Sequence, residues 1–195
     1  MREDYSNFDG FAVIDFETTG LHLDKGDRAV QIAIVRTDLD GNITSTWSHY
    51  INPERRMAAE HIHGISDAVA QASPPFHELV EGIMHRIENR ILVAHNLKFD
   101  GDFLTAELNR SGIAFDYHSM PQFCTQETAV HFLPQLRSHR LTACLDAVGV
   151  SFADGGTGKA HDAETDAVAT SKLMKHYLDE NPDLFFKLVV PAKNK

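Results

Sequence analysis

Three short acidic motifs follow one another along the chain, and they contain the residues best suited to chemistry. They are Asp15-Phe-Glu17-Thr-Thr-Gly, His95-Asn-Leu-Lys-Phe-Asp100 and His161-Asp-Ala-Glu-Thr-Asp166. Each motif lies beside apolar sequence, where an unpaired carboxylate is costly to bury unless a cation or hydrogen bonds offset the cost. Because Mg²⁺ and Mn²⁺ prefer oxygen ligands, the three motifs together suggest one metal site.

The first motif follows a short apolar run, residues 11–14, which is typical of a buried strand ending in Asp15. If the strand continues, Asp15 and Glu17 point to the same face while Phe16 points away. Two carboxylates on one face suit a pair of cations, which needs at least one bridging carboxylate. A turn at the end of the strand is an equally good explanation of these two residues taken alone, because Asp-x-Glu is a weak motif.

Helical spacing separates the acids of the second motif. Asp100 repeats with Leu104 and Leu108, so it lies on the apolar face that would pack on a sheet. Asp102 falls on the solvated face of the same helix. A capping role at the start of the helix is the alternative for Asp100.

The third motif can be read in the same way. Asp166 continues into the mostly apolar stripe of Ala169 and Leu173, whereas Glu164 continues along a more polar face. We therefore expect Asp166 to point inward and Glu164 to be solvated. Asp162 shares the phase of Asp166, but its place at the start of the helix favours capping.

His161 precedes this helix and follows the run Gly155-Gly-Thr-Gly158, which has high backbone freedom and predicts a mobile loop. A neutral imidazole, with an unperturbed pKa of about 6.5, can take a proton from water near neutral pH. The chain has 12 histidines, so a structural role is the alternative, and the position just before Asp166 favours a catalytic one.

Alternating strands and helices must position these motifs. Residues 29–36 and 43–51 read as strands joined by a turn at 38–41, and residues 91–94 read as a buried strand leading into His95. The predicted helices span residues 58–70, 76–88, 100–110, 122–132, 141–148 and 162–179. This order predicts an α/β fold with a mixed sheet.

Length and composition fit one domain. The chain has 195 residues, of which 43% are hydrophobic and 24% charged, enough to bury a core. We expect a domain over residues 1–180 and a tail over 181–195, whose apolar part docks on the domain. Only two cysteines are present, and the charged amino terminus lacks an apolar signal region, so we expect a cytoplasmic protein. No stretch approaches membrane-spanning length.

A net charge of −10 opposes tight binding along a nucleic-acid duplex, because affinity for phosphate normally rests on clustered lysines and arginines. Two bound divalent cations would reduce the charge to −6 and place positive charge at one phosphate. We therefore expect local binding at nucleic-acid ends.

Together the motifs resemble those of the DEDDh family of 3′–5′ exonucleases, and the chain is similar to the proofreading ε subunit of bacterial DNA polymerase III and to ribonuclease T. The resemblance extends from residue 11 to about residue 178. It includes three intermediate segments: Val30-Gln-Ile-Ala33, Ile62-His-Gly-Ile65, and Cys124-Thr125 ahead of a helix. Any one motif is weak, but three in order are specific.

The resemblance implies a ribonuclease-H-like fold with a five-stranded mixed sheet flanked by helices. It also implies a metal-dependent enzyme that releases nucleoside 5′-monophosphates from single-stranded or frayed 3′ ends, with DNA favoured over RNA. The metal site would hold two Mg²⁺ or Mn²⁺ ions through Asp15, Glu17, Asp100 and Asp166, with His161 as general base. The substrate contacts it implies are Thr18, Thr19, His63, Ile65 and Asn96.

Several alternatives stay open at the level of sequence. The same fold could be a non-catalytic module that binds nucleic acid or serves as a scaffold, an exoribonuclease that processes RNA, or a different hydrolase such as an endonuclease. A polymerase or a second copy of the chain could be a partner, and neither has a persuasive binding segment in the sequence. Ile62 and Ile65 could equally belong to the core.

Overall fold

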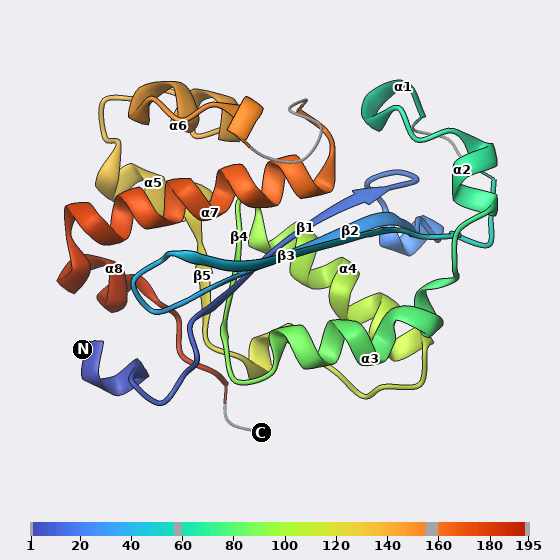
Figure 1. Ribbon diagram of the computed structural model, residues 1–195, viewed down its shortest axis with the longest axis horizontal. Helices are drawn as coiled ribbons and strands as arrows, with labels where there is room; N and C mark the ends of the chain where they lie inside the picture. The colour runs from blue at the N-terminus through green and yellow to red at the C-terminus, as the bar shows by residue number, and fades with distance from the viewer. Residues whose placement is uncertain (1, 57–59, 155–159, 194–195) are drawn as a thin grey trace.

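A five-stranded mixed sheet forms the centre of the protein (Figure 1). The computed structural model describes residues 2–56, 60–154 and 160–193. The strands lie in the order β3-β2-β1-β4-β5, and β2 runs antiparallel to its neighbours while β1, β4 and β5 are parallel. Their bounds are β1 Phe11–Thr18, β2 Ala29–Thr37, β3 Ile43–Tyr50, β4 Ile91–Ala94 and β5 Gln122–Cys124. The α/β fold and mixed sheet predicted from the sequence are confirmed.

Helices cover both faces of the sheet, with α5 to α8 on one side and α3 and α4 on the other (Figure 1). The α-helices are α1 Glu60–His63, α2 Asp67–Gln71, α3 Phe76–Ile87, α4 Leu97–Arg110, α5 Thr125–Phe132, α6 Leu141–Val148, α7 Ala163–Glu180 and α8 Pro182–Leu188. Short 3₁₀ helices are η1 Arg2–Tyr5, η2 Leu23–Lys25, η3 Tyr117–Ser119 and η4 Phe152–Asp154.

Side-chain alternation along β1 decides where its carboxylates point. Phe11 and Val13 pack in the layer that contains α7, whereas Ile14 and Phe16 pack in the layer that contains α4. Successive residues of a strand point to opposite faces. The α7-facing row therefore continues through residues 15 and 17, which brings both carboxylates to the α7 side at the carboxyl end of the strand.

The end of the chain packs against the sheet. Phe185 and Phe186 of α8 are buried, and the Phe185 ring lies 4.1 Å from the Phe123 ring, centroid to centroid. Beyond α8, the backbone of Val190 forms two hydrogen bonds with Gln122, of 2.8 and 2.9 Å, along the outer edge of β5. The apolar terminal segment is thus part of the core and covers part of this sheet edge.

Four predicted element bounds were wrong. The helix expected over 100–110 begins three residues earlier, at Leu97. The first strand continues through Asp15 to Thr18, because β2 pairs with it over its whole length. The expected helix over 58–70 is two short helices separated around Gly64, whose φ of 72° is left-handed; residues 57–59 lie outside the described residues. The expected helix over 122–132 begins only at Thr125, because residues 122–124 form β5 beside β4.

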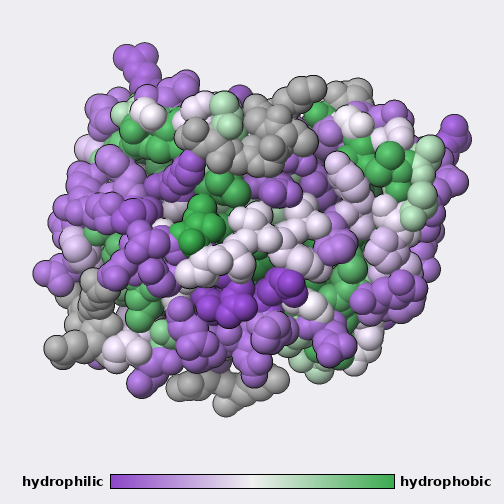
Figure 2. Space-filling view, in the orientation of Figure 1, coloured by the Kyte–Doolittle hydropathy of each residue, from purple (hydrophilic) through white to green (hydrophobic). Residues whose placement is uncertain are grey.

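On the face shown in Figure 2, hydrophilic side chains dominate and apolar ones lie in separate patches. Within the described ranges, no helix combines the length and the hydropathy that crossing a membrane requires.

Candidate active site

A pocket of about 390 Å³ at the carboxyl ends of β1 and β4 brings the three acidic motifs together. Five of its lining residues are the acids and the histidine predicted to be catalytic: Asp15, Glu17, Asp100, His161 and Asp166. They come from β1, from the first turn of α4 and from the start of α7. Both helical layers thus contribute to one site at the end of the sheet.

Asp100 reaches the pocket from the layer opposite to Asp15 and Glu17. It is 4% exposed, and its Oδ1 accepts a hydrogen bond of 3.0 Å from the backbone N–H of Phe16. The inward orientation predicted from helical spacing is confirmed. The capping alternative is wrong, because Asn96 occupies the N-cap position of α4. Asp102 lies on the outer face, where Lys98 donates a 2.7 Å hydrogen bond to its carboxylate.

The start of α7 carries His161 and Asp166. Asp162 is the N-cap, as predicted, and accepts a hydrogen bond from the backbone N–H of Thr165. One turn later, Oδ2 of Asp166 accepts a 3.2 Å hydrogen bond from the backbone N–H of His161. Oδ1 of Asp166 is buried and has no hydrogen-bond partner among the described residues.

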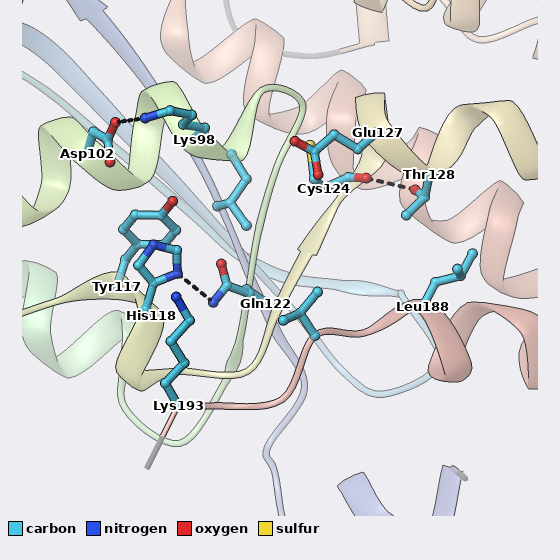
Figure 3. Close-up of a pocket in the computed structure, with 12 residues that line it drawn as sticks. Lys98, Asp102, Tyr117, His118, Gln122, Cys124, Glu127, Thr128, Leu188 and Lys193 are labelled. Carbon is cyan, nitrogen blue, oxygen red and sulfur yellow. Dashed lines mark hydrogen bonds and ion pairs between the residues drawn. The ribbon is translucent and has the colours of Figure 1, made fainter. Parts of the chain in front are cut away.

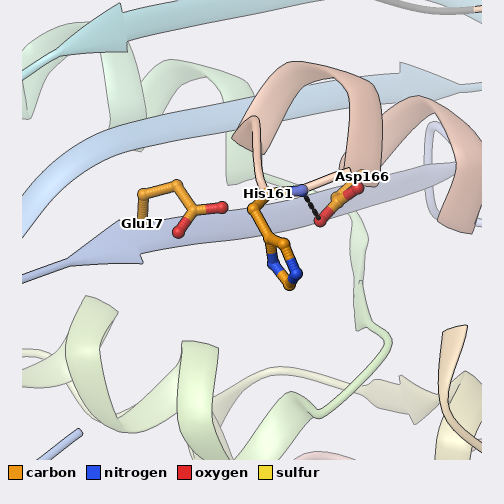
Figure 4. Close-up of side chains that lie close together, drawn as sticks. All are labelled: Glu17, His161 and Asp166. Atoms are coloured by element: carbon orange, nitrogen blue, oxygen red, sulfur yellow. Dashed lines mark hydrogen bonds between the residues drawn. The ribbon is translucent and has the colours of Figure 1, made fainter. Parts of the chain in front are cut away.

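Glu17, His161 and Asp166 lie close enough to share one ligand. Each offers a side-chain ligand atom, and the three atoms lie within 4.8 Å of one another. Figure 4 shows Glu17 on β1 facing the two side chains from the start of α7. Carboxylate and imidazole groups that converge in this way suit a divalent cation.

His161 has an unusual backbone conformation. Its φ is +65°, in the left-handed region that non-glycine residues rarely adopt. Such backbone strain clusters at functional sites and persists only where surrounding contacts hold it. Its side chain is exposed at the pocket. The predicted mobile loop over 155–158 lies outside the described residues.

The four carboxylates of the pocket carry like charges and are buried together, so the pKa of each is raised. Burial, with the negative charges of Asp166 and Asp100, raises the pKa of Glu17 to about 8. Burial also raises the pKa of Asp100 to about 8 and that of Asp166 to about 6. The pKa of Asp15 is raised well above its usual range, first by burial and then by Asp100 and Asp166. Bound cations would reverse this preference for the protonated forms.

The predicted substrate contacts divide into two groups. Thr18, His63 and Asn96 line the pocket. Thr19 and Ile65 are not among its lining residues, and their contact with substrate stays a prediction. Thr19 is 1% exposed and its hydroxyl donates to Asp27, whereas Ile65 packs in a small cluster with Val30 and Ala70.

Two apolar residues that the sequence prediction did not assign to substrate, Leu21 and Ile62, line the pocket instead. Their exposed fractions are 72% and 51%, high for large apolar side chains. The only indication in the sequence was their position: Leu21 directly follows the first motif, and Ile62 directly precedes His63. Sequence spacing could not tell that they face the pocket, because Leu21 lies in a connecting segment and Ile62 in the short helix α1, and neither is long enough to show a periodic pattern.

His95 lines the same pocket but is fully engaged elsewhere. Its Nε2 donates to the backbone carbonyl of His139 at 2.9 Å, so its Nδ1 accepts from the Thr125 hydroxyl at 3.0 Å. Burial lowers the pKa of His95 to about 4. His95 is therefore a neutral residue that joins the end of β4 to the first residue of α5 and to the segment before α6.

A second pocket, also of about 390 Å³, borders the same first turn of α4 (Figure 3). Several of its polar side chains bond to one another or to the backbone. Lys98 pairs with Asp102, and the Gln122 side-chain amide lies 3.3 Å from Nδ1 of His118. Thr128 donates to the carbonyl of Cys124 at 2.7 Å.

Comparison with known proteins places the chain among nucleases. A family model described as exonuclease matches residues 12–174. The protein named 3′-5′ exonuclease DinG from Bacillus subtilis (strain 168) is 31% identical over 172 residues, which are 87% of this chain and 18% of that protein. DNA polymerase III PolC-type from Oceanobacillus iheyensis is 32% identical over 168 residues, 85% of this chain and 11% of that protein. The chain spans less than a fifth of the length of either relative.

Solved structures share the fold. E. coli exonuclease I in complex with a dA16 oligonucleotide superposes with a TM-score of 0.76 at 23% identity, over 91% of this chain and 42% of that one. The nuclease domain of 3′hExo, described as a DEDDh family member bound to rAMP, has a TM-score of 0.75 at 16% identity, over 90% of this chain and 94% of that one. The ribonuclease-H-like fold implied by the sequence resemblance is confirmed.

Proposed function

The chain belongs to the RNase T exonuclease family, and we propose that it is a metal-dependent 3′–5′ exonuclease acting on single-stranded or frayed ends. It removes nucleoside 5′-monophosphates one at a time. The observation that carries the proposal is the convergence in one pocket of four carboxylates whose pKa values are raised. One of them has a buried oxygen that finds no hydrogen-bond partner in the described part of the chain.

The four carboxylates fit a pair of divalent cations. Their donor atoms are all oxygen, the preference of Mg²⁺ and Mn²⁺, and the unpartnered Oδ1 of Asp166 is ready for a ligand. Asp15, Glu17, Asp100 and Asp166 would hold the ions. When bound, two such ions lower the pKa of the attacking water and stabilise charge on the phosphoryl oxygens.

The remaining side chains orient substrate and move the proton. His161 accepts the proton of the attacking water, because its ring lies at the pocket opening beside Glu17 and Asp166. The hydroxyl of Thr18 already donates to the carbonyl of Gly20 and so fixes the pocket wall, while Asn96 offers an amide to the terminal nucleotide. Leu21 and Ile62 give the base an apolar surface.

DNA is the favoured substrate. The relatives are named for a 3′-5′ exonuclease and a DNA polymerase, and one structural neighbour was solved with a dA16 oligonucleotide. RNA is the second candidate, because another neighbour was solved with rAMP. Likeness to a PolC-type polymerase also favours a polymerase as partner over a second copy of the chain, and a replicative or repair setting implies the cytoplasm.

A direct test uses matched DNA and RNA oligonucleotides labelled at the 5′ end, at one fixed salt concentration, with Mg²⁺ or Mn²⁺. We expect products that shorten stepwise from the 3′ end, faster for DNA, with nucleoside 5′-monophosphates released. A circular single strand should stay intact. If neither nucleic acid is shortened with either metal, the proposal is wrong, and digestion of the circle would indicate an endonuclease.

A further inference from the structure

We propose that Gln31 is a positioning residue that holds the start of α7 against the sheet, and with it His161 and Asp166. The inference rests on the proposed exonuclease function, since it assigns a role within that site. Gln31 does not line the pocket itself. It acts through Asp162 and Ala163, the two residues that follow His161.

Gln31 lies beside the site on the strand next to β1. In the register of the sheet it is the direct partner of Glu17. It belongs to the same row of β2 as Ala33 and Val35, which pack in the layer of α7. Gln31 is 3% exposed, so its amide must find partners within the protein.

Both ends of the amide bind the start of α7. Nε2 donates a hydrogen bond of 3.0 Å to Oδ1 of Asp162, and Oε1 accepts one of 3.2 Å from the backbone N–H of Ala163. A weaker contact of 3.3 Å joins Nε2 to the hydroxyl of Ser48 on β3. One side chain thus supplies a donor to a carboxylate and an acceptor to a helix N–H.

These bonds complete the cap of α7. While Oδ1 of Asp162 binds Gln31, its Oδ2 accepts from the backbone N–H and the hydroxyl of Thr165, at 3.2 and 2.7 Å. Ala163 is fully buried, so loss of Gln31 would leave its N–H without an acceptor, which is costly. The helix start would then shift or fray rather than stay in place.

A displaced helix start would disturb catalysis first. His161 lies one residue before the Gln31 contacts and Asp166 three residues after Ala163, and the two are themselves joined by a hydrogen bond. Reactive groups lose rate steeply when moved by about 1 Å. Because the nucleotide also contacts β1 and α4, substrate binding should change less than turnover.

The polarity of the amide gives a sharp test. Glutamate has the same shape, but a carboxylate at residue 31 would face the carboxylate of Asp162 and could not donate to it. Asparagine at residue 162 would restore a donor. In the doubly substituted protein, Gln31→Glu with Asp162→Asn, residue 162 therefore donates the hydrogen bond and residue 31 accepts it. Asparagine is also a good N-cap.

The experiment is a double-mutant cycle on the full chain with saturating Mg²⁺, measuring kcat and KM for a single-stranded oligonucleotide. We expect Gln31→Glu to lower kcat at least about 10-fold with KM within about twofold of wild type, because an interaction needed for positioning is lost. The doubly substituted protein should recover kcat to within about threefold of wild type.

Two controls separate positioning from folding. Gln71→Glu makes the same change on α2, where the Gln71 amide donates to Asp67, and should leave kcat unchanged. Ile83→Val removes one methyl group from the core of the α3 layer and should lower the unfolding temperature without lowering kcat. If Gln31→Glu does not fold, Gln31→Met keeps the length and packing and should still show the loss in kcat.

Three results would overturn the assignment. They are a doubly substituted protein no faster than Gln31→Glu alone, a folded Gln31→Met with wild-type kcat, and a loss that resides in KM. Each presupposes an active wild-type protein. An inactive wild type would instead contradict the proposed function, so the two failures can be told apart.

Discussion

The two pockets beside the first turn of α4 have about the same volume but handle charge in opposite ways. In the candidate active site, carboxylates from three elements converge, and each has a raised pKa. In the second pocket, Lys98 pairs with Asp102, Gln122 contacts His118, and the other acid, Glu127, is exposed to solvent. Asp100 and Asp102, two residues apart on one helix, belong to these two opposite settings.

The comparison shows that pocket volume alone does not identify the functional site. Buried carboxylates whose negative charge has no compensating cation among the described residues do. Burying like charges together is unfavourable, and proteins keep such clusters where a ligand supplies the opposite charge. The carboxylate of Asp102, which Lys98 already pairs, has no such need. Substitutions in the two pockets should therefore have effects of different size on the exonuclease rate, and effects on the free energy of unfolding that differ even in sign.

The largest difference is expected from removing one carboxylate in each pocket. Asp15→Asn should lower the exonuclease rate at least about 10³-fold, because a cation ligand is lost. The matched change Asp102→Asn should leave the rate within about twofold of wild type. Rates of oligonucleotide shortening at saturating Mg²⁺ test the pair, and equal losses in both proteins would remove the distinction between the pockets.

His161→Gln should have the next largest effect, a loss of about 10² to 10⁴-fold, the usual contribution of a general base. Because the four carboxylates remain, binding of Mn²⁺ measured by calorimetry should change little. If metal binding is lost together with activity, His161 is a ligand and another group accepts the proton.

The pH dependence of stability should differ between metal-free and metal-bound protein. Glu17 and Asp100 have folded pKa values of about 8 and Asp166 about 6, all above their unfolded values near 4. The raised pKa values of these carboxyl groups contribute to the free energy of unfolding. This contribution is fully present below about pH 4 and is lost as the pH rises through 6 to 8.

In chelator, the unfolding temperature should accordingly fall by at least about 4 °C between pH 5 and pH 8, and Mg²⁺ should reverse the fall at pH 8. Thermal melts followed by circular dichroism measure both. Asp102→Asn should leave the pH profile unchanged, since Asp102 is not part of the cluster. If the unfolding temperature in the presence of chelator does not change with pH, the negative charges of the carboxylates are compensated by groups of the protein itself.

The smallest effect is expected in the second pocket. Lys98 is highly exposed, so Lys98→Gln removes only a surface ion pair with Asp102 and should shift the unfolding temperature by less than about 2 °C. Oligonucleotide shortening should continue at the wild-type rate. A marked loss of activity would show that this pocket takes part in the reaction, and the distinction between the two pockets would then be wrong.

Much of the site follows from periodicity in the sequence. The spacing of Asp100 with Leu104 and of Asp166 with Leu173 correctly predicted which acids face inward, because helical phase is a local property. The strand at residues 91–94 was also predicted correctly, since four consecutive apolar residues precede His95. Local patterns therefore identify both the side chains that line the candidate site and the elements that carry them.

The misses depend on distant partners. The three residues of β5 are a strand only because β4 and Val190 pair with them, and no local pattern encodes that. The place of Leu21 at the pocket was not predicted either, because hydrogen bonds between Thr19 and the segment at Asp27 and Arg28 shape this loop. Gln31 likewise gains its role from α7, far away in the sequence.

The site joins residues that are far apart in the sequence, which affects the order of events during synthesis. Asp15 is made about 150 residues before Asp166 of α7, and Phe185 of α8 must still pack on Phe11 to complete the core. Contacts between residues so distant in sequence form late in folding. A ribosome-bound chain therefore holds isolated acidic motifs with ordinary acidity, and nuclease activity arises only once nearly the whole domain has been made.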